Sequence, residues 1–240
     1  MQIDVWCKTD KGLRRESNQD SFLINRDLGL FVVADGMGGH SGGEVASSMA
    51  VEISEEVVRG LKPRGHGARE TVLKIYEESC HRIYDRAAQQ APQLSGMGTT
   101  MVMLYMAGQS MFVGNVGDSR AYLFRKPHLW QLTEDHSLLN EQLRAGLVRE
   151  DQIRQFVGRN VITRSVGYER DVMADVLERP LKPGDCFLLC SDGLSGLVTD
   201  AKIAEILNTT PLDQVVDKCV EQALANGGDD NVTVLFLAVT

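Results

Sequence analysis

Two apolar segments of this chain end at an Asp-Gly pair, and there a carboxylate could do chemistry. Asp35 follows the run Leu-Phe-Val-Val-Ala, and Asp192 follows the run Phe-Leu-Leu-Cys-Ser. Apolar runs of this kind are typical of buried strands, so each carboxylate is expected at the end of a rigid core strand and near solvent. Asp-Gly is also a common turn, and that ordinary interpretation stays open for either pair taken alone.

Further aspartates lie beside turn residues and could join these two in an acidic cluster. The candidates are Asp20, Asp35, Asp118, Asp192, Asp229 and Asp230. Carboxylates a few ångströms apart repel one another, so such a cluster binds protons or cations, and an all-oxygen set favours Mg²⁺ or Mn²⁺ over zinc. Two such ions about 3.5–4 Å apart activate water and hold phosphoryl oxygens, which indicates metal-assisted hydrolysis of a phosphate ester. The alternative is that these aspartates are separate turn and cap residues.

Composition narrows the classes of partner and compartment. A chain of 240 residues with 43% apolar and 24% charged residues is ordinary for a folded globular protein. Its net charge of −8 argues against nucleic acid as the main partner. No apolar run is long enough for a membrane span, and the first residues do not form a signal peptide. The five cysteines are odd in number and form no CxxC pair, so free thiols in a reducing cytoplasm are expected.

The hydrophobic pattern predicts strands and helices that do not alternate regularly. Strands are expected at 3–9, 21–24, 30–34, 99–106, 110–116, 120–124, 185–191 and 232–239. Helices are expected at 43–61, 68–90, 137–145, 149–156, 200–207 and 212–225, with Asp200 as a cap. Because regular β-α-β alternation is absent, the pattern favours mostly antiparallel sheet covered by helices. No repeat or linker interrupts the chain, so 1–240 is expected to form a single domain.

Seven short motifs follow one another from about Thr9 to the C-terminus. They are Gly12–Asp20, Val33–His40, Gly98–Thr100, Gly114–Ala121, Thr133–Ser137, Leu189–Leu194 and Gly228–Thr233. In content and order these motifs resemble the metal-dependent PP2C-type (PPM) Ser/Thr protein phosphatases, in their compact bacterial form. The resemblance implies an α+β fold, a four-layer αββα sandwich of two mostly antiparallel sheets flanked by helices. It also implies a variable flap beside the site, at about 146–167.

The resemblance further implies a set of site residues. The implied metal ligands are Asp20, Asp35, Gly36, Asp118, Asp192 and Asp230. Asp35 is expected to bridge two Mn²⁺ or Mg²⁺ ions, and Asp118 and Asp192 to hold a third, weaker one. Asp35 and His40 are the expected catalytic residues, and Arg15 is expected to grip the substrate phosphate with its two-pronged guanidinium.

Some assignments have alternatives. Arg14 is the alternative to Arg15 as the phosphate-binding residue. If it does not bind phosphate, Arg14 is a solvated charge in the loop. His40 is equally well interpreted as a loop histidine that orders the turn, since three residues separate it from Asp-Gly. Asp229 is expected to be a turn neighbour and not a ligand, and His136 is expected at a helix start.

The implied activity is hydrolysis of phosphoserine and phosphothreonine in proteins through a metal-bridging hydroxide. Phosphoproteins, a Ser/Thr kinase and its substrates are the implied partners of a monomeric, cytoplasmic enzyme. A tyrosine-phosphatase mechanism is disfavoured because the chain has no Cys-x5-Arg signature. The alternative function is a catalytically weak or inactive regulator of the same fold that binds phosphoproteins. The complete aspartate set favours the enzyme.

Overall fold

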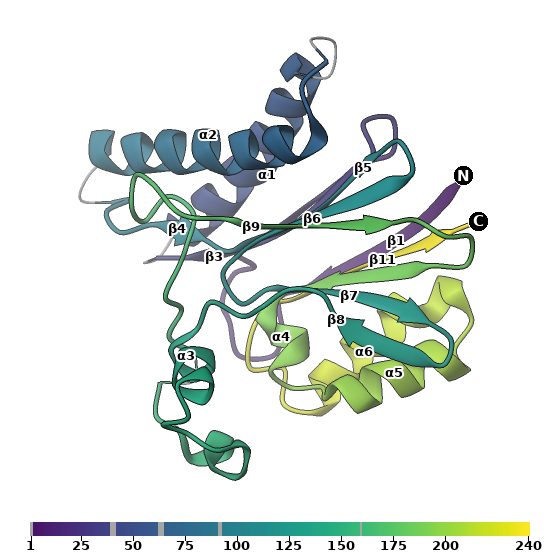
Figure 1. The fold of residues 1–240 in the computed structure, drawn as a ribbon. Helices are drawn as coiled ribbons and strands as arrows, with labels where there is room; N and C mark the ends of the chain where they lie inside the picture. Colours follow the sequence, from purple (N-terminus) through teal and green to yellow (C-terminus); the bar gives the residue numbers. More distant parts are fainter. Residues whose placement is uncertain (1, 39–41, 62–64, 91–92, 159) are drawn as a thin grey trace.

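Two antiparallel sheets lie face to face in the computed structural model, and helices cover both outer faces (Figure 1). The structure describes residues 2–38, 42–61, 65–90, 93–158 and 160–240. The first sheet has, in order, β1 (Ile3–Asp10), β11 (Val232–Val239), β10 (Cys186–Cys190), β7 (Arg120–Arg125) and β8 (His128–Gln131). The second has β2 (Asp20–Asn25), β3 (Leu30–Met37), β5 (Met101–Ala107), β6 (Ser110–Val116) and β9 (Asp175–Pro180), with β4 (Gly98–Thr99) paired to β3.

The helices form the outer layers. Over the second sheet lie α1 (Gly42–Leu61) and α2 (Ala68–Gln89). Over the first sheet lie α4 (Asp192–Ser195), α5 (Asp200–Thr209), the short 3-10 helix η3 (Leu212–Gln214) and α6 (Val215–Ala225). The helix α3 (Leu138–Arg144) and the 3-10 helix η2 (Glu150–Gln155) lie apart from both layers, on a segment that projects from the sandwich (Figure 1). The predicted αββα sandwich is confirmed.

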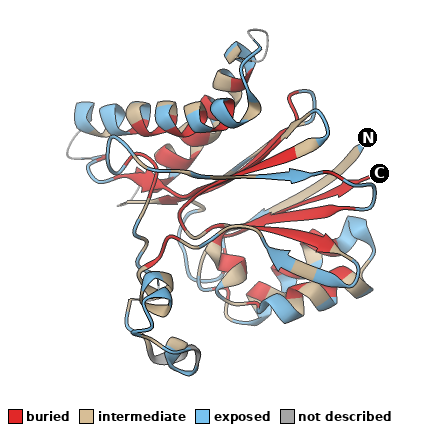
Figure 2. Ribbon diagram, in the orientation of Figure 1, coloured by how far each residue is buried: buried red, intermediate tan, exposed pale blue. Residues whose placement is uncertain are grey.

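Strand β3 shows why these sequences become core strands. Successive side chains of a strand point to opposite faces, so an apolar run can fill two layers at once. Phe31 and Val33 pack between the two sheets, whereas Val32 and Ala34 pack under helices α1 and α2. All four are fully buried, and the central strands of both sheets are the most buried part of the molecule, whereas edge strands such as β9 are more exposed (Figure 2).

The predicted elements are largely confirmed, with some differences. The helix predicted at 149–156 is the 3-10 helix η2, the one at 212–225 is divided into η3 and α6, and the short helix α4 was not predicted. Strands β8 and β9 were not predicted, because both are edge strands whose mostly polar, partly exposed residues lack a buried stripe. Thr199 caps helix α5, and Asp200 is its first residue, so the predicted cap was wrong by one position. The five cysteines are free, as expected. Among the described residues no helix has both the length and the apolar character to cross a membrane.

The strand register brings several chain turns to one end of the sandwich. Asp20, at the start of β2, lies opposite Asp35 near the end of β3. Met101 at the start of β5 pairs with Val116 at the end of β6, so the turn after β6 lies at the same end. The chain termini lie at the other end (Figure 1). Residues far apart in the sequence therefore meet where β3, β6 and β10 end.

Candidate metal centre

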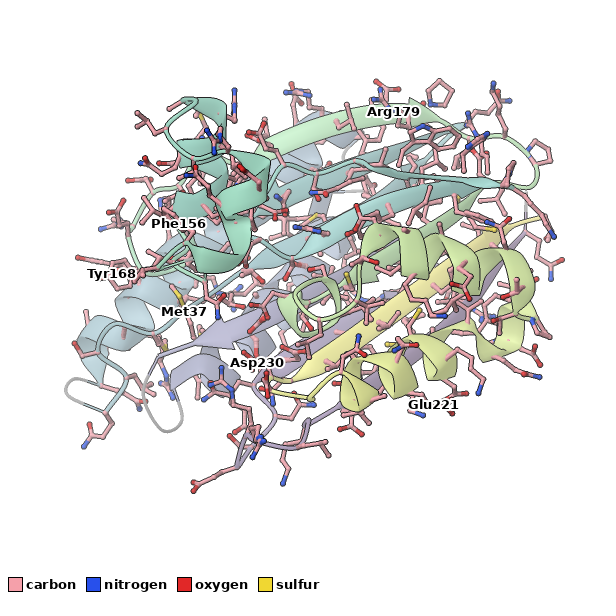
Figure 3. The ribbon with its side chains drawn as sticks, turned by 90° about the horizontal axis from the view of Figure 1, so that it is seen from below. Met37, Phe156, Tyr168, Arg179, Glu221 and Asp230 are labelled. Atoms are coloured by element: carbon pink, nitrogen blue, oxygen red, sulfur yellow. The ribbon has the colours of Figure 1, made fainter. Side chains whose placement is uncertain are left out.

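A cavity of about 590 Å³ lies at this end of the sandwich, and carboxylates line it. Its acidic lining residues include Asp35, Asp118, Asp192 and Asp230, and Arg15 is its basic residue. Asp230 lies between the last helix, α6, and strand β11, and it is labelled in Figure 3. These side chains keep partial exposure toward the cavity while protein surrounds them on the other sides.

Asp35 is held through both of its backbone groups. Its N–H donates to the Thr100 hydroxyl at 3.0 Å, and its carbonyl accepts from the Thr99 hydroxyl and the Thr100 N–H, both at 2.9 Å. Burial raises the pKa of the Asp35 carboxyl well above its usual range, and the neighbouring Asp20 and Asp192 carboxylates raise it further. A cation in the cavity would lower the free-energy cost of keeping these carboxylates ionised.

Gly36 allows helix α1 to approach the metal centre closely. A Cβ atom at Gly36 would lie 2.0 Å from the carbonyl oxygen of Gly43, the second residue of the helix. The Gly36 N–H donates to the Gln19 carbonyl at 3.1 Å, and this bond fixes the loop before β2. Only glycine fits here, and its backbone lines the cavity directly after Asp35.

Asp20 is clamped by two hydroxyl groups behind Asp35. Its Oδ2 accepts from Ser191 Oγ at 2.8 Å and from Thr233 Oγ1 at 2.7 Å. Its Oδ1 is buried and has no hydrogen-bond partner among the described residues. Burial raises the pKa of Asp20 to about 7, and the two hydroxyl hydrogen bonds only partly offset this effect. A buried carboxylate oxygen without a partner is costly, and a cation or its hydration water would satisfy it.

Asp192 follows strand β10, and Asp230 precedes strand β11. Burial raises the pKa of Asp192, the Asp230 carboxylate adds to this rise, and a hydrogen bond with the Asp35 carboxyl opposes it. Asp192 Oδ1 is a second buried oxygen that has no partner in the described part of the chain. Arg15 Nη2 donates to Asp230 Oδ2 at 2.6 Å. The guanidinium is thereby held at the mouth of the cavity with other N–H groups free to face a ligand.

Asp118 projects from the turn between β6 and β7. The preceding Gly117 has φ +104°, and a Cβ atom there would lie 2.6 Å from Thr100, so glycine is required. The N–H of Gly117 donates to Nδ1 of the buried His136 at 3.1 Å, and the Nε2 atom of this ring lies 3.2 Å from an Asp175 oxygen. Burial and the Asp192 carboxylate raise the pKa of Asp118 to about 7. His136 thus braces the turn that carries Asp118.

The donor set fits a hydrated hard cation. No group of three Asp, Glu, His or Cys side chains within the described ranges is drawn together tightly enough to hold an ion by itself. The unpartnered oxygens of Asp20 and Asp192 and the raised carboxyl pKa values nevertheless indicate a place for positive charge. Mg²⁺ and similar ions keep several water ligands and need few protein oxygens, which agrees with carboxylates spread around a roomy cavity.

The structure brings most of the predicted site residues to one place. Around the cavity lie Arg15, Asp35, Gly36, Asp118, Asp192 and Asp230, with Asp20 directly behind. Asp229 is exposed and does not line this cavity; its carboxylate lies 3.8 Å from Arg14 Nε. His40 lies outside the described residues, so its predicted role stays a prediction. His136 lies at the start of helix α3, as expected, directly before Ser137, which caps the helix by accepting from the Asn140 N–H.

Several residues that hold the site were not singled out from the sequence. They are Thr99, Thr100, Ser191, Asn231 and Thr233. Asn231 ties the loop that carries Arg15, since its side-chain amide donates to the Lys11 and Ser17 carbonyls at 2.9 Å and its oxygen accepts from Gln19 N–H at 2.8 Å. Each of these residues belongs to one of the seven motifs or adjoins a candidate aspartate. That position in the sequence is the signal from which they could have been predicted.

Comparison with known proteins places this geometry in a family. The family description "Protein phosphatase 2C" matches residues 13–229. The chain is 37% identical over 235 residues to the serine/threonine phosphatase stp of Listeria innocua, covering 96% of this chain and 93% of that protein. The crystal structure of the Mycobacterium tuberculosis serine/threonine phosphatase PstP/Ppp matches with a TM-score of 0.91 at 31% identity, over 99% of this chain and 98% of that one. A structure of the PstP catalytic domain with two manganese ions matches with a TM-score of 0.86 at 31% identity, over 99% of both chains. The chain therefore belongs to the protein phosphatase 2C family.

Proposed function

We propose that this protein is a metal-dependent Ser/Thr protein phosphatase that hydrolyses phosphoserine and phosphothreonine in proteins. The observation that carries this proposal is the set of carboxylates around one cavity, beside Arg15. Burial raises the pKa of Asp35, Asp118 and Asp192, and Asp192 has a buried oxygen without a hydrogen-bond partner among the described residues. The relatives named as serine/threonine phosphatases support it.

Asp35, the Gly36 carbonyl, Asp192 and Asp230 would hold two divalent cations, and Asp118 with Asp192 a third. The PstP structure with two manganese ions supports Mn²⁺ as one usable metal, and Mg²⁺ suits the same oxygen donors. Bound there, such ions supply an activated water and neutralise phosphoryl oxygens. Asp20 would orient metal-bound water through its free Oδ1. Placed after Gly36, His40 would protonate the leaving serine or threonine oxygen.

Arg15 would bind the substrate phosphate. Replacing Arg15 by alanine is expected to lower kcat/KM for a phosphothreonine peptide about 100-fold, mostly through KM, because a charge-assisted two-pronged hydrogen bond is lost. Arg14→Ala is the matched control, since Arg14 is exposed, neighbours Arg15 and does not line the cavity. Steady-state kinetics on both variants decide between the two arginines: a larger loss in the Arg14 variant would reverse the assignment.

The decisive experiment measures phosphate release from a phosphothreonine peptide with Mn²⁺ and then with a chelator. Turnover is expected with Mn²⁺, none with chelator, and a loss of several hundredfold in Asp192→Ala, because this carboxylate serves both proposed metal positions. Turnover that persists with chelator would refute the metal mechanism. Absence of turnover under every metal condition would instead support a phosphoprotein-binding protein without activity.

The wider biological setting is also part of the proposal. Relatives named as serine/threonine phosphatases support a role in reversing the action of a Ser/Thr kinase. Five free, mostly buried cysteines support the cytoplasm as compartment. The two sheets share one central apolar layer, which supports a single domain over 1–240. We also propose that this domain acts as a monomer. Asn160 and Ile162 line the cavity, which supports a flap at about 146–167 beside the site.

A further inference from the structure

A second cavity, of about 550 Å³, adjoins the metal centre. Met37 and Ile162 line both cavities, so the two share a wall. Met37 is the last residue of β3, two positions after Asp35, and Ile162 pairs with Ser137 in an isolated bridge. The second cavity therefore lies beside the place where the carboxylates would bind a phosphate.

The second cavity has a mixed lining, and part of its wall consists of exposed apolar side chains. Val161, Tyr168 and Met173 line it with 49%, 57% and 71% of their surface exposed. Met37 and Tyr168 both pack against Gly98, since a Cβ atom at Gly98 would lie 2.9 Å from Met37 Cε and 3.3 Å from Tyr168 Cβ. Large apolar side chains that stay exposed together are typical of binding surfaces.

The position of this wall relative to the metal centre is visible from below. In Figure 3, Met37 is drawn between Asp230 of the metal centre and Tyr168 at the outer edge. The labelled Arg179 and Glu221 lie away from this line, on other parts of the surface. The apolar wall thus leads outward from the site of phosphate binding.

Most charges near the second cavity are already paired. Arg164 lies 3.3 Å from an Asp175 carboxylate oxygen, and Asp171 lies 3.0 Å from the His81 ring. Glu169 is exposed and forms no ion pair among the described residues. The surface offered to a ligand therefore combines exposed apolar side chains with the exposed carboxylates of Glu169 and Asp171, which disfavours an acidic group.

We propose that this second cavity is a substrate subsite that binds an apolar side chain flanking the phosphorylated serine or threonine. The proposal rests on the proposed function, because the phosphate must sit in the metal centre. An extended peptide advances about 3.3 Å per residue, so its next few side chains pass over Met37 toward Tyr168 and Met173. A volume of about 550 Å³ accommodates a large aliphatic or aromatic side chain.

The test compares phosphothreonine peptides that differ at one flanking position, with leucine, serine or glutamate there, scanned over three residues on each side. With Mn²⁺, kcat/KM at one or two positions is expected to be about tenfold higher for leucine than for serine, and lowest for glutamate. In the Tyr168→Ser/Met173→Ser double variant, the leucine-to-serine ratio is expected to fall toward one. This ratio does not depend on the fraction of folded enzyme.

Two further variants control the interpretation. Tyr168→Leu keeps an apolar wall and is expected to retain the preference. Trp130→Ser removes an exposed aromatic residue on β8, which lines neither cavity, and is expected to leave the ratio unchanged. A wild-type ratio near one at all positions, or an unchanged ratio in the double variant, overturns the subsite alone. Failure to turn over any peptide refutes the proposed function and the subsite with it.

Discussion

Asp35→Asn is expected to lower phosphothreonine turnover by about 1000-fold or more, the largest effect that the structure predicts for one side chain. Asparagine keeps the shape of the residue and the backbone hydrogen bonds to Thr99 and Thr100. It removes the negative charge at the centre of the carboxylate ring, on which metal binding and activation of water depend. Steady-state kinetics at saturating Mn²⁺ measure the loss.

The same substitution is expected to raise the thermal stability of the metal-free protein by a few degrees. Burial and neighbouring carboxylates raise the pKa of Asp35 well above its usual range, so its charged form destabilises the folded state near neutral pH. A neutral amide removes this repulsion and can donate a hydrogen bond to the Asp192 carboxylate. Differential scanning calorimetry in chelator measures the melting temperature.

Asp229→Asn is the matched control, because it removes an exposed carboxylate one residue from Asp230. Both turnover and melting temperature are expected to change little in this variant. If Asp35→Asn lowered stability together with activity, the loss of turnover would report misfolding, and the assignment of Asp35 to the metal centre would lose its support.

The core strands could be predicted because their apolar runs fill two layers at once. Residues 30–34 read as a buried strand from either face, and the structure places them between helix α1 and the opposite sheet. Strands β8 and β9 carry no such signal, because an edge strand needs hydrogen bonds from one neighbour only and tolerates polar residues. Their positions follow from the tertiary pairing and not from their own residues.

The carboxylates of the site could be proposed from turns and motifs, but the contacts that hold them could not. The hydrogen bond from Thr233 to Asp20 joins residues 213 positions apart, and the bond from Ser191 joins residues 171 positions apart. No local sequence pattern corresponds to such spacings. These side chains come together only when the two sheets pack against each other. The position of Tyr168 could not be predicted for the same reason, since it lies in an irregular segment and packs against Gly98, as Met37 does.

A rise in pH is expected to lower the stability of the metal-free protein, whereas added Mn²⁺ is expected to raise the stability. The pKa of Asp20 and of Asp118 is raised to about 7, so the folded state binds protons more tightly than the unfolded state. The metal-free protein is therefore expected to lose stability as pH rises from 6.5 to 8. The lowered pKa of the buried His136 works in the opposite direction mainly below pH 6.5, so the two carboxylates outweigh it in this window.

Mn²⁺ binds the deprotonated carboxylates, so its stabilising effect is expected to grow over the same interval. At 100 times its dissociation constant an ion contributes about 2.7 kcal/mol, which corresponds to about 5–10 °C in melting temperature for a chain of this size. Thermal melts at pH 6.5 and 8, with Mn²⁺ and with chelator, measure both slopes. Asp20→Asn is expected to flatten the metal-free slope. A metal-free protein that is more stable at pH 8 would show that these carboxylates do not repel one another in the folded state.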